Sequence, residues 1–234
     1  DMNDVTGTVF IDSQNRKWFP LESGGVLCYD DKTWKRYSTE NGFFSNSIRE
    51  IHQDSQGRLW FLSWHDGLAM LDGDSWTVFT KINGLSGNSI TALAIDHHDI
   101  VWIRYRNGIF SYNGAIWQQH DKNMDYTVSG VDEIIIDRFN DKWIISSDKI
   151  IINDDTLCTT FECRDPYLRY IGSSNISLVD YINTIWLIRD WKLASLRRSS
   201  SANPPVAPNR EILLLGSFPN PFNGETAIDF ELAE

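Results

Sequence analysis

The sequence has little cysteine, a deficit of basic residues and no long apolar run. Three cysteines among 234 residues are too few for a disulfide framework, so we expect buried thiols, with a Cys158–Cys163 pair as the alternative. The formal net charge is −11, and no basic stripe of the kind that nucleic acid or an anionic membrane requires is visible. Because no apolar stretch approaches the ~20 residues of a transmembrane helix, we expect no membrane span in this chain.

The motifs of common catalytic sites are also absent. The chain has no Gly-x-Ser-x-Gly elbow, no His-Glu-x-x-His helix and no phosphate-binding glycine-rich loop. His97-His98-Asp99 occupies a turn position, where neighbouring side chains point apart, so we interpret it as a solvated turn and not as a metal site. His120 aligns with aromatic positions and is interpreted as a packing residue. We therefore expect no catalytic residue, no cofactor and no metal.

What the sequence does contain is a repeat. An aspartate followed six residues later by a tryptophan recurs five times, with aspartate spacings of 42, 42, 41 and 43 residues. A second series, displaced from the first, consists of Trp34, Trp76 and Trp117, with Cys158 in the fourth register. Self-similarity at a fixed period is typical of repeat architectures. The repeated pairs are Asp12 and Trp18, Asp54 and Trp60, Asp96 and Trp102, Asp137 and Trp143, and Asp180 and Trp186.

Each repeat reads as four short strands. In the second repeat these are residues 48–53, 59–62, 68–71 and 76–79, separated by segments rich in Gly, Asn and Asp, and no helical period is evident. Four antiparallel strands per ~42 residues form the blade of a β-propeller. The sequence therefore predicts an all-β fold of such blades. We interpret the tryptophan as a wedge between neighbouring sheets and the aspartate as a turn former.

The second repeat resembles a known family. Asp54-Ser-Gln-Gly57-Arg-Leu-Trp60-Phe61, then Gly67-Leu68, Asp72-Gly73, Trp76 and Asn83-Gly84-Leu85, resemble the two-component regulator propeller repeat. The resemblance covers roughly residues 5–199. It implies blades that form the extracellular sensing portion of sensor proteins, often responding to oligosaccharides, or that belong to secreted proteins. It also implies a larger, seven-bladed propeller, of which about five blades would be visible here; a closed five-bladed ring is the alternative.

The repeats divide the chain into three parts. Blades are expected over residues 1–199, with repeats starting near residues 5, 48, 90, 131 and 175, and the fifth stops after its second strand region near Leu196. Residues 200–210 read as a Pro- and Ser-rich linker. Within residues 211–234, Pro219-Asn220-Pro221-Phe222-Asn223 resembles the start of an immunoglobulin-like type IX secretion (Por) sorting domain, here truncated. We expect that segment to lie outside the blades or to pair only loosely with them.

The resemblance of the C-terminal segment implies a location and a partner. A sorting domain implies contact with the secretion machinery and a protein that is secreted or held on the outer cell surface. A periplasmic sensor portion is the alternative.

The variable loops between the second and third strands of each blade carry the candidate binding residues. Aromatic rings stack on sugars while charged groups bind their hydroxyls, so Trp64, Tyr105 and Trp191 are predicted stacking groups. Arginine forks favour an acidic sugar or another carboxylate. Surface aromatics that cover a neighbouring blade are the alternative, and Phe43, Phe44 and Leu85 are interpreted as core residues. The full predicted ligand set is Trp64, His65, Asp66, Tyr105, Arg106, Arg189 and Trp191.

Three functions follow as hypotheses. The first is a ligand-binding or sensing propeller that is not an enzyme, with an oligosaccharide or another protein as partner. The second is a protein–protein interaction scaffold, which would present a flat face. The third is a propeller lyase or glycosidase, which would require titratable groups that converge on the central channel.

Overall fold

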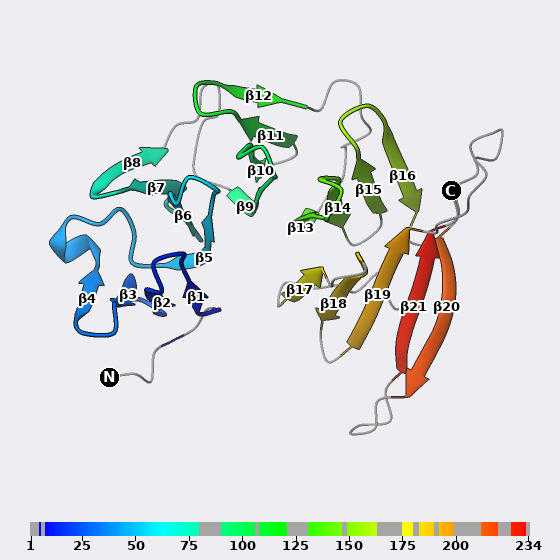
Figure 1. Ribbon diagram of the computed structural model, residues 1–234, viewed down its shortest axis with the longest axis horizontal. Helices are drawn as coiled ribbons and strands as arrows, with labels where there is room; N and C mark the ends of the chain where they lie inside the picture. Colours follow the sequence, from blue (N-terminus) through cyan, green and yellow to red (C-terminus); the bar gives the residue numbers. More distant parts are fainter. Residues whose placement is uncertain are drawn as a thin grey trace. The chain divides into compact units, whose positions relative to one another are not determined.

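Figure 1 shows a computed structural model of the chain. It describes residues 5, 8–79, 90–105, 108–120, 131–146, 149–162, 175–179, 183–189, 192–198, 212–219 and 226–232. For residues 131–132, 161–162, 175–178, 186–189, 192–198, 212–219 and 226–232 only the backbone is described. The chain divides into two compact units, residues 1–127 and 128–234, and each is treated by itself.

Four sheets of four antiparallel strands follow one another along the chain, and each is one predicted blade (Figure 1). Within the described residues the only helix is a 3₁₀ turn at Thr39–Asn41. The all-β prediction is therefore confirmed. Blade 1 contains β1 (Phe10–Ile11), β2 (Lys17–Pro20), β3 (Val26–Tyr29) and β4 (Trp34–Tyr37), and blade 2 contains β5 (Ile48–Gln53), β6 (Leu59–Ser63), β7 (Leu68–Asp72) and β8 (Ser75–Phe79). Blade 3 contains β9 (Ile90–Ile95), β10 (Val101–Tyr105), β11 (Gly108–Tyr112) and β12 (Trp117–Gln119), and blade 4 contains β13 (Val131–Ile136), β14 (Lys142–Ser146), β15 (Lys149–Asn153) and β16 (Cys158–Glu162).

The fifth sheet departs from the sequence prediction in two ways. It has a third strand of its own repeat, so that repeat does not stop after its second strand. It also includes the C-terminal segment, in the order β17 (Asn175–Val179), β18 (Ile185–Arg189), β19 (Lys192–Arg198), β21 (Thr226–Leu232) and β20 (Ile212–Pro219). The expectation that this segment lies outside the blades is wrong, because β21 pairs in parallel with β19, from Ala194 with Ile228 to Arg198 with Leu232. The physical reason is that β19 presents an open edge, which the alternating β21 can pair.

Two of the repeated tryptophans, Trp18 and Trp60, lie in cores between neighbouring sheets. Trp18 and Trp60 are fully buried. The Trp18 ring lies 5.3 Å from that of Phe61 in blade 2, and the Trp60 ring lies 6.2 Å from that of Tyr112 in blade 3. Each tryptophan thus fills the space between its own sheet and the next, where the large area of its ring contributes most to stability.

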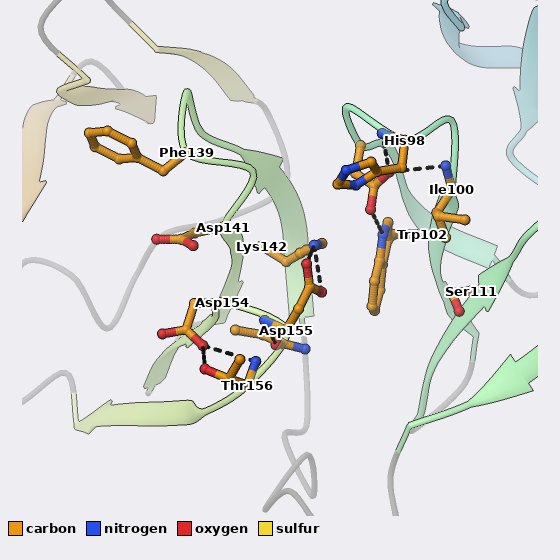
Figure 2. Close-up of polar contacts among 12 residues, drawn as sticks. His98, Ile100, Trp102, Ser111, Phe139, Asp141, Lys142, Asp154, Asp155 and Thr156 are labelled. Atoms are coloured by element: carbon orange, nitrogen blue, oxygen red, sulfur yellow. Dashed lines mark hydrogen bonds and ion pairs between the residues drawn. The ribbon is translucent and has the colours of Figure 1, made fainter.

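Each of the four described repeat aspartates organises the turn after the first strand of its blade. One carboxylate oxygen accepts the backbone N–H groups two and four residues on, and the other accepts the indole N–H of the tryptophan six residues on. In blade 3, the N–H groups of His98, Ile100 and Trp102 converge on the Asp96 carboxylate (Figure 2). Asp180 and the side chain of Trp186 lie outside the described residues.

Candidate functional site

Three loops meet at one end of blades 1 and 2. They are the β2–β3 turn (residues 21–25), the β4–β5 connection (residues 38–47) and the β6–β7 loop (residues 64–67). The Gly25 N–H donates to the Asn46 carbonyl at 2.9 Å, and the Trp64 N–H donates to the Ser47 carbonyl at 3.0 Å. Loops from two blades are therefore bonded to one another. Gly25 has φ +81°, and a Cβ there would lie 1.9 Å from the Tyr37 carbonyl oxygen, so glycine is required for this approach.

Trp64 is the exposed aromatic residue of this end, with 47% of its surface accessible. The guanidinium of Arg49 lies over its ring, 4.6 Å from the centroid. Arg49 Nε also lies 3.1 Å from Glu50 Oε1. A cation over the face of a tryptophan is attracted by the ring quadrupole, and the Glu50 carboxylate also binds the guanidinium. The ring of Trp64 is therefore supported from one face.

A β-bulge places Arg49 under this ring. Ile48 pairs with Ser63 and Glu50 pairs with Leu62, so Arg49 is an extra residue without a partner across the β5–β6 ladder. Bulges redirect a side chain at the edge of a sheet and are common next to functional sites. The register also shifts near the start of the first strand in blades 3 and 4. The sequence analysis did not identify Arg49 as a site residue. The repeat predicts a strand over residues 48–53, but it does not predict that this strand is bulged at Arg49.

Buried hydroxyls hold Asp66 in place. Ser45 donates to Asp66 Oδ2 at 2.6 Å, and the Ser63 hydroxyl lies 3.5 Å from the same oxygen. The two hydroxyls lie 2.8 Å apart, and both serines are fully buried. Asp66 itself is half-buried and His65 is exposed. We call Arg49, Trp64, His65 and Asp66 the Trp64 surface; it combines a supported aromatic ring with a fixed carboxylate.

One predicted ligand residue proves to be misplaced. Tyr105 is the last residue of β10 and not part of a loop, and only 4% of its surface is accessible. It belongs to the core between blades 2 and 3, where its ring lies 6.0 Å from that of Phe110. Its burial leaves no exposed face for a sugar, so the prediction that Tyr105 stacks on a ligand is wrong. The physical reason is that β10 extends to Tyr105, which pairs with Ile90, so the residue stands at the buried end of the strand, as Ser63 and Ser146 do in blades 2 and 4.

The remaining predicted residues are only partly described. Arg106 and Trp191 lie outside the described residues, and for Arg189 only the backbone at the end of β18 is described. Leu85 also lies outside, while Phe43 is buried against Phe61 and Trp76. Among the described members of the predicted set, those that lie together in an exposed loop are Trp64, His65 and Asp66.

The histidines and cysteines of the described part do not form a metal-binding group. Among the residues that the structure describes, no three His, Cys, Asp or Glu side chains gather as ligands for an ion. His97 and His98 are exposed in a turn, and the His120 ring packs 4.8 Å from that of Trp102. Cys28 is buried without a disulfide, Cys158 is half-buried, and Cys163 lies outside the described residues.

Comparison with known proteins identifies the fold. The family model of the two-component regulator propeller matches residues 42–65, which contain the first half of blade 2. The extracellular domain of the hybrid two-component system BT4673 from B. thetaiotaomicron aligns at 18% identity over 93% of this chain and 30% of its own length, with a TM-score of 0.64. No curated protein matches this chain.

Two further solved structures have a similar fold. PorZ, a surface component of the type-IX secretion system of Porphyromonas gingivalis, aligns at 20% identity over 77% of this chain and 30% of its own, with a TM-score of 0.58. Inactive virginiamycin B lyase from Staphylococcus aureus aligns at 13% identity over 91% of this chain and 76% of its own, with a TM-score of 0.64. The chain thus spans less than a third of the sensor domain and of PorZ.

These likenesses, at identities of 20% or less, show the fold alone. Among the described residues there is no helix of the length and apolar character that a membrane span needs. The four-stranded sheets, the tryptophans between them and the solved neighbours agree, and the chain is built of β-propeller blades related in fold to the extracellular domains of two-component sensors.

Proposed function

We propose that the chain is part of an extracellular β-propeller that binds oligosaccharides and does not catalyse a reaction on them. The observation that carries the proposal is the Trp64 surface, where an exposed indole is supported by Arg49 and lies in the same loop as the anchored Asp66. An aromatic face with adjacent polar groups matches a pyranose, which has apolar C–H faces and a rim of hydroxyls.

The rigidity of this surface supports binding. The β6–β7 loop is closed by the Ser63 N–H to Gly67 carbonyl bond at 2.9 Å and is tied to the neighbouring connection through Ser47. A site that is already ordered loses less conformational entropy when a ligand binds. Weak stacking and a few hydrogen bonds give affinities in the range of ~µM to mM.

A glycan titration tests the proposal. The purified 234-residue chain is titrated with an oligosaccharide panel by isothermal calorimetry, beside Trp64→Ala. We expect saturable binding that the substitution abolishes, with an unchanged melting temperature because the ring is half-exposed. Trp34→Ala is the matched control, since Trp34 is 50% exposed and lies in blade 1, away from the β6–β7 loop of blade 2. Absence of binding to every glycan would refute the proposal.

A protein-interaction scaffold is the second candidate, and the outer face of blade 1 favours it. Trp34 is 50% exposed and stacks on Tyr29 at 4.5 Å, and Ile11 is 59% exposed. The equivalent tryptophans of the next two blades, Trp76 and Trp117, contact rings of the preceding blade. The outer face of blade 1, which carries Trp34 and Ile11, is therefore suited to pack against a further β-sheet, as the equivalent faces of blades 2 and 3 do. Sedimentation equilibrium of the chain and of Trp34→Ser across the micromolar range tests this. If the two proteins have the same molecular mass at every concentration, self-association through this face is contradicted.

We also propose that the protein is secreted or displayed on the outer surface, with the secretion machinery as partner. The Pro219–Asn223 motif supports this, as does the fold likeness to extracellular sensor domains. Cell fractionation of a strain that expresses the protein with residues 211–234 deleted tests it. We expect the deleted form to remain on the periplasmic side of the outer membrane. Unchanged export would contradict the proposal that the segment directs secretion.

A further inference from the structure

The charges around Trp64 point to the chemical class of the ligand. We infer that the Trp64 surface binds a neutral pyranose, which stacks on the face of Trp64 opposite Arg49 and donates a hydroxyl to the Asp66 carboxylate. The inference rests on the proposed function and narrows it, because it excludes uronic acids and sulfated sugars as ligands of this surface. It also replaces the sequence-based prediction of an acidic sugar, which rested on the arginines of the loops between the second and third strands.

The position of Arg49 makes the stacking one-sided. Its guanidinium lies over one face of the indole, 4.6 Å from the ring centroid, and 47% of the surface of Trp64 is accessible, so we assign the sugar to the opposite face. A ring with one open face holds one sugar as a platform and cannot enclose it between two aromatics. The cation also fixes the plane of the ring, so that less rotamer freedom is lost when a sugar binds. Arg49 is therefore a positioning residue that acts through Trp64.

The local charge disfavours an anion. The guanidinium of Arg49 is the one cation of this group, and it lies 3.1 Å from the Glu50 carboxylate, which offsets it. The second carboxylate is Asp66 on the β6–β7 loop. One guanidinium therefore faces two carboxylates, with His65 in the same loop and His52 Nε2 3.5 Å from Glu50 Oε2, on a chain whose net charge is −11 with neutral histidines. A carboxylate or sulfate on the ligand would be repelled, whereas neutral hydroxyls are not.

The anchoring of Asp66 suits a hydroxyl donor. Ser45 and Ser63 are fully buried, and both hydroxyls approach Oδ2 of Asp66. These contacts fix the orientation of the carboxylate, two residues after Trp64 in the same loop. A charged acceptor of this kind forms stronger hydrogen bonds to hydroxyls than a neutral one, because the acceptor carries a full charge. Asp66 therefore supplies direction, while Trp64 supplies the contact area.

Intrinsic tryptophan fluorescence and calorimetry with two glycan series test the inference. The neutral series comprises gluco-, galacto- and xylo-oligosaccharides, and the acidic series comprises oligogalacturonates and heparin-derived oligosaccharides. We expect binding of at least one neutral oligosaccharide, with any acidic one at least ~10-fold weaker, which corresponds to ~1.4 kcal/mol. Asp66→Asn should weaken neutral binding about 10-fold. Arg49→Met should weaken it about threefold to tenfold, and Arg49→Lys should restore part of the loss because it keeps the cation.

The outcomes separate the two proposals. Preferential binding of acidic sugars through Trp64 would overturn the inference and leave the proposed function standing. Neutral binding that is unaffected by Asp66→Asn and by Arg49→Met would also overturn it. Absence of binding to either series would instead refute the proposed function. Circular dichroism of each variant, with Trp34→Ala as the control for loss of an exposed indole, ensures that a binding loss is not a folding loss.

Discussion

At the scale of single residues, the Asp-x5-Trp pair is a structural unit with two tasks. The Asp54 carboxylate accepts the backbone N–H groups of Gln56 and Arg58, which closes the turn. It also accepts the Trp60 indole N–H at 3.0 Å, so a donor that is fully buried between two sheets is satisfied. A buried donor without a partner costs ~1–3 kcal/mol. The two residues therefore depend on each other, which explains their constant spacing.

Trp60→Phe removes the indole N–H but keeps an aromatic ring in most of the space between the sheets. We expect Trp60→Phe to lower the free energy of unfolding by about 1–3 kcal/mol, because the Asp54 carboxylate loses a donor. Trp60→Ala should lose ~3–5 kcal/mol, because it leaves a large cavity between the sheets. Urea unfolding measures both changes. Trp64→Ala is the control at an exposed position, and its free energy of unfolding should differ from that of the parent by no more than about 0.5 kcal/mol. Equal stability of Trp60→Phe and the parent would show that the bond contributes nothing.

The pH dependence of stability reports on the same carboxylates. Burial acts to raise the pKa of Asp12, but hydrogen bonds from the Trp18 indole and from the backbone and guanidinium of Arg16 outweigh it, so the pKa lies below its usual 3.8. A lowered folded-state pKa stabilises the protein above pH 3.8, and this contribution is lost as the pH falls through the folded value. Urea midpoints between pH 6 and pH 2.5 should therefore fall more for the parent than for Asp12→Asn. Parallel curves would contradict the assignment.

The Cys28 thiol should be inert in the folded chain. Burial raises the pKa of Cys28 to about 11, so almost no thiolate is present at pH 8. Pulsed alkylation with iodoacetamide, read by mass spectrometry, should modify Cys28 about two orders of magnitude more slowly in buffer than in urea. Similar rates in the two conditions would mean that the first blade opens readily.

At the scale of elements, the turns between the third and fourth strands follow a rule. All four have a residue with positive φ: Gly73 and Gly114 in blades 2 and 3, and Asp31 and Asp155 in blades 1 and 4. Where the residue is aspartate, a lysine begins the second strand and pairs with it, as Lys142 does with Asp155 at 2.6 Å (Figure 2). Where it is glycine, Leu59 or Val101 begins that strand. In blades 1 and 4 the lysine therefore stands where blades 2 and 3 have an apolar residue, and the aspartate stands where they have a glycine. The two positions change together.

A double-mutant cycle tests this exchange. The Lys142 side chain is 1% exposed, so Asp155→Gly leaves an ammonium group buried without its carboxylate and should cost about 2 kcal/mol, reduced from larger values because Asp155 is half-exposed. Lys142→Leu with Asp155→Gly copies blade 2 and should recover most of that loss. Urea unfolding of the four proteins gives the coupling energy. Additive losses would show that the two positions are independent.

Turn side chains also join neighbouring blades. Asp99, with φ +61°, accepts the backbone N–H of Ser55 at 2.7 Å and its hydroxyl at 2.6 Å, which links blade 3 to blade 2. Asn183 occupies the equivalent turn position and accepts the Arg138 N–H at 2.8 Å, which links the fifth sheet to blade 4. Gly57 has no side chain to do this, and Gln53 instead accepts the Ser13 N–H. Adjacent sheets are thus held by hydrogen bonds as well as by aromatic packing.

At the scale of the whole molecule, the C-terminal segment is the element whose position differs from the sequence prediction. Its strand β21 takes the place that a fourth strand holds in the other blades, but it runs parallel to its neighbour, whereas every other neighbouring pair of strands is antiparallel in the described sheets. The pairing covers the edge of β19, which would otherwise present unpaired backbone groups.

Deleting residues 212–234 tests this pairing by hydrogen exchange. We expect the amides of Ala194–Arg198 in β19 to exchange at least ~10-fold faster without the segment, because their partners are lost. The amides of β6 in the first unit serve as the control and should not change. Unchanged protection of β19 would mean that the segment stands apart from the sheet, as a sorting domain would.

The sequence by itself determined the blade architecture. The spacing of Asp54 and Trp60, the alternation within each strand and the turn residues between strands are local properties, and they recur in register, so one repeat predicts all of them. Exposure of Trp64 could also be predicted, because its position in a loop outside the periodic pattern removes it from the core.

Only the tertiary structure decided which side chains meet. The bulge at Arg49 redirects a side chain toward Trp64, and the pairing of Tyr105 with Ile90 makes that tyrosine the buried end of β10; both are properties of strand register. Ser45 reaches Asp66 across 21 residues, and β21 pairs with β19 from still farther along the chain. Local propensity specifies strands and turns, whereas ladder register, bulges and edge pairing are set by the packing of segments that are distant in sequence. The blades could therefore be predicted from the sequence, whereas the contacts of Arg49 with Trp64 and of Ser45 with Asp66 could be identified only in the structure.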